Sequence, residues 1–69
     1  MTAKQLKWKH GERLIGRQIH TPPMGEYPGG IAQVVALTPD EACPEIVLQV
    51  KHPTFGEIGV FEHEDVALV

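Results

Sequence analysis

The 69-residue sequence predicts an all-β domain in which five short strands close into a small barrel. Apolar segments rich in Val, Ile and Leu, typical of strands, recur at residues 31–37, 46–50, 58–61 and 66–69. The last two segments flank a polar break of four residues, which is too short for more than one helical turn. Closing the strands into a barrel covers most of the edges that an open five-stranded sheet would expose.

Residues 1–10 are expected to form an N-terminal arm outside the barrel, which spans residues 11–69. The arm alternates loosely between basic and apolar residues, so we expect a mobile segment or an added edge strand. Two roles are open for Trp8, which lies between two lysines. Its ring either folds back over an open end of the barrel, or it stacks on a base or enters a partner's pocket.

The first strand is predicted at residues 13–19, and Gly16 within it suggests a β-bulge. Residues 20–30 then form a long loop, because three prolines and three glycines exclude regular structure there. Tyr27 on this loop either presents its ring to a ligand or plugs the loop against the barrel.

The remaining strands are predicted at residues 31–37, 45–51, 58–61 and 66–69. Only Gln33 is polar in the second strand, which favours a central position. A polar hairpin loop at residues 38–44 precedes the third strand, and a one-turn helix at residues 62–65 precedes the last. Together with the long loop after the first strand, this element order is that of an SH3-like small barrel.

The composition of the chain limits the cellular location and the partners that are expected for such a domain. A chain of this size has a marginal core, so association with a partner or a second copy would add stability. Cys43 is the single cysteine, which excludes an intrachain disulfide and favours a reducing, cytoplasmic location. No apolar window approaches the ~18 residues that a membrane span requires, so no membrane partner is expected. The net charge of −3 argues against a nucleic-acid partner, although five of the six basic residues precede residue 18.

No catalytic residue, cofactor or metal site is predicted from the sequence. Glu62, His63 and Glu64 alternate possible ligands, but the spacings of known zinc sites are absent. The chain contains no serine, and Cys43 lies between the acidic residues Glu41 and Glu45, a poor setting for a reactive thiolate. The glycines at 29 and 30 lack the lysine and following helix of a phosphate-binding loop.

Short motifs in residues 11–69 resemble the plasmid-borne type II dihydrofolate reductases. The matching segments are residues 11–14, 29–31, 38–40, 52–53 and 56–61. In that family a Val-Gln-Ile-Tyr segment of the fourth strand lines the pore of a tetramer and contacts folate and NADPH. The matching residues here are Ile58, Gly59, Val60 and Phe61. Gly59 and Phe61 lack the amide and hydroxyl that such a site needs, so the resemblance implies the fold and self-association through this strand, without the reductase activity.

The expected function is a small non-enzymatic interaction module that binds a protein partner or self-associates. The candidate partner-binding residues are Trp8, Tyr27, Phe55 and Phe61. Two alternatives stay open. One is a nucleic-acid-binding barrel that uses the basic arm with Trp8, Arg13 and Arg17. The other is a divergent oligomer that binds a small molecule at a symmetric pore.

Overall fold

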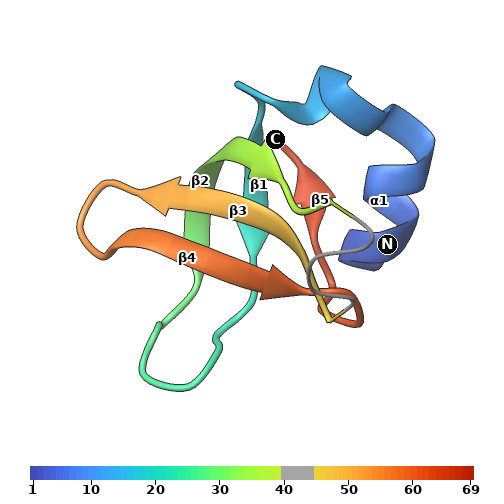
Figure 1. Cartoon of the computed structure of the whole chain (residues 1–69). Helices are drawn as coiled ribbons and strands as arrows, with labels where there is room; N and C mark the ends of the chain where they lie inside the picture. The colour runs from blue at the N-terminus through green and yellow to red at the C-terminus, as the bar shows by residue number, and fades with distance from the viewer. Residues whose placement is uncertain (40–44) are drawn as a thin grey trace.

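The computed structural model describes residues 1–39 and 45–69, which form one five-stranded antiparallel sheet with a short α-helix at one end (Figure 1). The elements are α1 (Ala3–His10), the 3₁₀-helix η1 (Gly11–Leu14), β1 (Gln18–Thr21), β2 (Gly30–Leu37), β3 (Ile46–His52), β4 (Gly56–Phe61) and β5 (Ala67–Leu68). The strand order is β4-β3-β2-β1-β5, so β4 and β5 are the two edges. A mostly β domain with five antiparallel strands is therefore confirmed, whereas the sheet of the described residues does not close into a barrel. Cys43 and most of the loop predicted at residues 38–44 lie outside these residues.

The central strands lie close to their predicted positions, and the first strand does not. Residues 11–14, expected to lead into and begin that strand, instead form η1, which places the Leu14 side chain in the core with no exposed surface. Gly16 follows with a φ of 91°, a backbone conformation that favours glycine, and its N–H donates to the carbonyl of Val34. The predicted bulge at Gly16 is therefore a turn before β1. The register irregularity lies in β2, between Val34 and Ala36.

The N-terminal segment is a docked helix, so the prediction of a mobile arm or edge strand was wrong. The Thr2 side chain accepts a hydrogen bond from the Gln5 N–H, and the Gln5 side chain accepts one from the Thr2 N–H, which completes a capping box. Ala3 and Leu6 are buried against the sheet. Trp8 is 78% exposed, so its ring does not fold back over the sheet. Leu6 covers this end of the sheet instead.

The acidic segment at residues 62–65 is a turn, where a one-turn helix was expected. It contains a hydrogen bond from the Glu64 N–H to the Phe61 carbonyl at 3.2 Å. Its carbonyl groups are used by α1, because the N–H groups of Ala3 and Lys4 donate to Glu64 and Glu62 at 2.8 and 3.1 Å. The turn thus places acidic residues beside the positive end of the helix dipole, which stabilises α1.

The core lies between the curved sheet and the two helices. Its fully buried side chains are Leu14, Ile19, Val34, Leu48, Val50 and Val60. Every strand from β1 to β4 contributes to this set, and η1 contributes Leu14. Figure 1 shows α1 at the end of the sheet opposite the β3–β4 turn. Within the described residues no helix has the length and apolarity needed to cross a membrane.

Candidate functional site

A groove of about 730 Å³ lies between the β1–β2 loop and strand β4. Its apolar lining consists of Met24 and Tyr27 from the loop and Ile58, Gly59 and Phe61 from β4. Edge strand β4 therefore forms one wall, and the Pro- and Gly-rich loop forms the other. We call this feature the β4 groove.

The loop wall is fixed by a buried hydrogen-bond chain. The hydroxyl groups of Tyr27 and Thr21 are 2.6 Å apart, and the Thr21 hydroxyl donates to the carbonyl of Gly30 at 2.8 Å. Because threonine has a single hydroxyl hydrogen, Tyr27 is the donor to Thr21. Tyr27 is only 5% exposed. The tyrosine therefore anchors the loop to the end of β1, and Thr21 links this anchor to the start of β2, as in the plug role considered above. Only part of the tyrosine ring reaches the groove.

An aromatic cluster supports Tyr27 from the side of the β3–β4 turn. Its ring packs edge-on against His52 and Phe55, with centroid distances of 5.5 and 5.8 Å. The His52 Nδ1 accepts hydrogen bonds from the N–H groups of Thr54 and Phe55 at 3.0 and 3.4 Å. His52 therefore orders the turn and positions Phe55, whose side chain is 50% exposed.

A second ring pair lies at the other end of β4. Phe61 stacks with His63 at a centroid distance of 5.9 Å, and both residues line the groove. The His63 Nε2 lies 3.3 Å from Oε1 of Glu64. Phe61 is 37% exposed, so it presents apolar surface that a bound segment can cover.

Gly59 on the groove wall is packed over by a neighbouring strand. A Cβ atom at this position would lie 3.1 Å from Cγ2 of Ile46 in β3. The space that a larger side chain would need here is thus partly taken by isoleucine.

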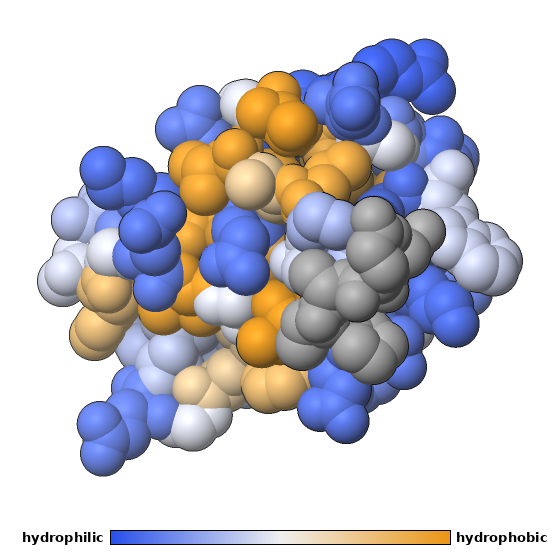
Figure 2. All heavy atoms as spheres, in the orientation of Figure 1, coloured by the Kyte–Doolittle hydropathy of each residue, from blue (hydrophilic) through white to orange (hydrophobic). Residues whose placement is uncertain are grey.

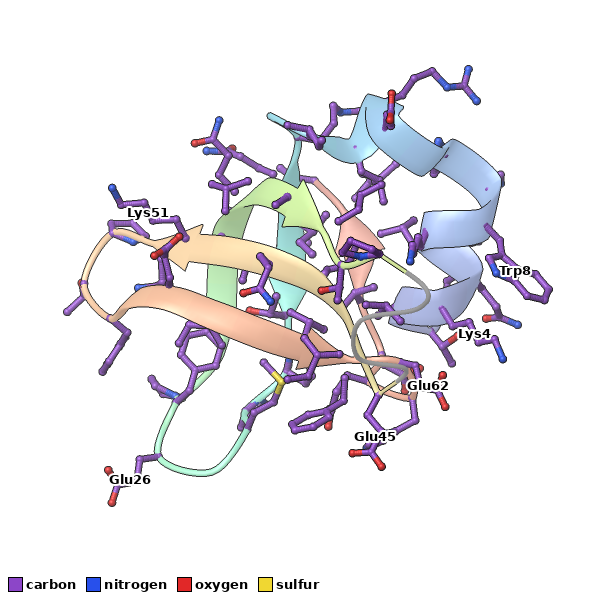
Figure 3. All side chains as sticks on the ribbon, in the orientation of Figure 1. Lys4, Trp8, Glu26, Glu45, Lys51 and Glu62 are labelled. Carbon is purple, nitrogen blue, oxygen red and sulfur yellow. The ribbon has the colours of Figure 1, made fainter. Side chains whose placement is uncertain are left out.

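The groove is acidic around its apolar lining. Glu45, Glu57, Glu62 and Glu64 all contribute to it. Figure 3 shows Glu45 and Glu62 together beyond the end of β4. Within the described part of the chain, none of these four carboxylates forms an ion pair with a lysine or arginine. Negative charge beside exposed apolar surface favours a ligand that is both cationic and apolar.

The structure brings three of the four predicted partner-binding residues together. Tyr27 and Phe61 line the β4 groove, and Phe55 contacts Tyr27 without lining it. Trp8 lies apart, on the outer face of α1 (Figure 3).

The acidic character of the groove was missed because Glu45 joins Glu57, Glu62 and Glu64 only through the pairing of β3 with β4. From the sequence, Glu62 and Glu64 are interpreted as part of a solvated acidic turn rather than as metal ligands. Across residues 1–39 and 45–69, no group of three or more His, Cys, Asp or Glu side chains is arranged to hold a metal ion.

Comparison of the chain with protein-family models, with curated proteins and with solved structures finds no significant match in any of the three.

Proposed function

We propose that this chain is a protein-interaction module, and that the β4 groove binds a basic segment carrying an apolar side chain. A single observation carries this proposal: the apolar lining of the groove lies beside four glutamates. None of the four has a lysine or arginine partner in the described chain. The apolar lining supplies affinity by burying surface, and the carboxylates supply orientation and selectivity for cations.

The walls of the groove are suited to binding without rearrangement. The loop wall is held by the Tyr27 hydrogen bond to Thr21, and the β4 wall is held by its pairing with β3. A preorganised site loses less conformational entropy when it binds than a mobile one. Binding at this site needs no catalytic group, in keeping with the expected non-enzymatic role.

The fold proposal is an SH3-like arrangement that stays open along one side. Support comes from the strand order β4-β3-β2-β1-β5, from the long β1–β2 loop, and from the turn that precedes β5. The resemblance to type II reductases adds to this support through the motifs on β2 and β4.

A peptide titration followed by NMR tests the binding proposal. The probe is a short synthetic peptide that alternates lysine with leucine and tryptophan, and its control replaces each lysine with glutamate. We expect the basic peptide alone to shift the amide signals of Ile58, Gly59 and Phe61, and added salt to weaken binding because it screens exposed charges.

Two alanine variants locate the site. Phe61→Ala removes an exposed ring of the groove, while Ile31→Ala removes an exposed side chain of β2 that does not line it. Weaker binding by Phe61→Ala alone supports the proposal. Equal binding by Phe61→Ala and the unmodified chain, with both folded, would exclude the groove as the binding site.

A further inference from the structure

We infer that the occupant of the β4 groove is helix α1 of a second copy of this chain, with Trp8 against the apolar lining and Lys4 and Lys9 beside its glutamates. This inference rests on the proposed function and names the partner. It assigns a role to Trp8, the most exposed aromatic residue of the described chain.

The outer face of α1 carries one large apolar side chain, Trp8, with lysine side chains near it. Lys4 and Trp8 are one helical turn apart, and the Lys4 Nζ lies 5.3 Å from the centre of the indole ring. The opposite face carries Ala3 and Leu6, which are buried. Trp8 is 78% exposed, the highest value among the large hydrophobic side chains of the described residues. Tryptophan is the type of residue that most often dominates binding energy at protein interfaces.

The charges of the chain are separated along the sequence, with the basic residues concentrated in the segment that contains α1. Residues 1–17 hold five lysines and arginines and one glutamate, a net charge of +4, whereas residues 18–69 hold one lysine and eight acidic residues, a net charge of −7. Together they give the net charge of −3 for the chain. Surfaces of opposite sign attract each other at long range and select their mutual orientation. The helix of one molecule thus matches the groove of another in charge as well as in apolar character.

The helix cannot fill the groove of its own molecule. Backbone hydrogen bonds from Ala3 and Lys4 to the turn at residues 62–64 fix its first turn. Figure 3 shows Trp8 pointing outward from α1, away from the sheet. In Figure 2 the side formed by α1 is mainly hydrophilic, while apolar atoms lie over the sheet. Each molecule therefore offers the exposed outer face of α1 and the β4 groove. Two copies can exchange these contacts in a two-fold dimer, or several copies can associate head-to-tail into rings or chains.

Sedimentation of the full chain between about 10 µM and 1 mM tests this inference, since an interface this small belongs to the weak class. We expect the mean mass to rise with concentration at low salt, and to fall to that of a monomer at about 1 M salt, where the screening length is ~3 Å. Trp8→Ala should weaken association by roughly 30-fold or more, as for a central interface residue. Ile15→Ala is the matched control, because Ile15 is also exposed but belongs to neither surface, and it should associate normally.

A charge exchange tests the pairing of the two surfaces. The double variant Lys4→Glu/Lys9→Glu and the double variant Glu57→Lys/Glu62→Lys should each be monomeric alone, and should associate when mixed in equal amounts. The variant Arg17→Glu/Lys51→Glu has the same net charge as the first but keeps both surfaces, so it should associate as the unmodified chain does.

Three results would overturn the inference. The first is a monomer at 1 mM in low salt, in which case the peptide titration described above still decides separately whether the groove binds a basic segment. The second is association that Trp8→Ala prevents but Phe61→Ala leaves unchanged, because the helix would then contact some other surface. The third is a monomer that binds single-stranded DNA through Trp8 in a salt-dependent way, which would assign the basic helix to nucleic acid.

Discussion

Replacing Gly29 by alanine should destabilise the protein far more than the same change at Gly25 in the same loop. Both glycines have a positive φ, of 84° at Gly29 and 61° at Gly25, so each substitution places a side chain in a conformation that costs about 1 kcal/mol or more. The surroundings differ. A Cβ at Gly29 would lie 2.8 Å from the Thr21 carbonyl oxygen and 2.9 Å from backbone atoms of Pro22 and Pro23, whereas nothing lies within 4 Å at Gly25.

The clash at Gly29 is with backbone atoms, so no side-chain rotation relieves it. Crowding of this kind costs about 1–3 kcal/mol, which gives a total near 2–4 kcal/mol for Gly29→Ala against about 1 kcal/mol for Gly25→Ala. The gain from a less flexible unfolded chain is the same for both variants and cancels in the difference. In a domain of this size, the additional destabilisation lowers the melting temperature by roughly 4–8 °C per kcal/mol.

Urea unfolding of the two variants and the unmodified chain measures both free energies. If the two variants unfold within about 0.5 kcal/mol of each other, the close approach of Gly29 to Thr21 is not present in the folded protein. The peptide titration adds a second measurement, because a displaced β1–β2 loop should also weaken binding in the β4 groove for Gly29→Ala.

Three further predictions concern the helix and the loop anchor, and urea unfolding measures each of them. Leu6→Ala should lower the free energy of unfolding by about 2–4 kcal/mol, because the Leu6 side chain is 2% exposed. Trp8→Ala should change this free energy by no more than about 0.5 kcal/mol, because Trp8 is exposed. Equal losses for the two variants would contradict the docking of α1. Tyr27→Phe should cost about 1 kcal/mol through the lost hydrogen bond to Thr21, and an unchanged stability would count against that bond. Thr2→Ala should cost about 1 kcal/mol and speed amide exchange in α1, and unaltered exchange would show that the cap is not formed.

The sequence predicts the middle of the sheet because its strands have a simple pattern. In β3, Leu48 and Val50 are fully buried, as the alternation indicates. Val47, which the alternation places on the other face, is also buried, beside a register irregularity between Ile46 and Leu48. The helix α1 was missed because only Ala3 and Leu6 face the sheet, which leaves too few apolar positions for a periodic signal. The capping-box motif formed by Thr2 and Gln5 is nevertheless recognisable in the sequence, and it marks the residue at which the helix begins.

The candidate site was predictable only in part. Tyr27 and Phe61 stood out as aromatic residues on a loop and a strand, and both line the groove. Their chemical context was not predictable, because Glu45 joins Phe61 only through strand pairing, and Tyr27 joins them only through the fold of its loop. Exposure also depends on tertiary contacts, and these bury Tyr27 while they leave Trp8 in solvent.

The contacts that hold α1 in place impose an order on folding. The N–H of Val66 donates to the carbonyl of Met1, and those of Ala3 and Lys4 donate to the turn at residues 62–64, so the helix is bound to a segment that the ribosome delivers long after it. A helix of eight residues is unstable alone in water. We therefore expect the N-terminal segment to become a stable helix only after the turn at residues 62–66 is available to cap it.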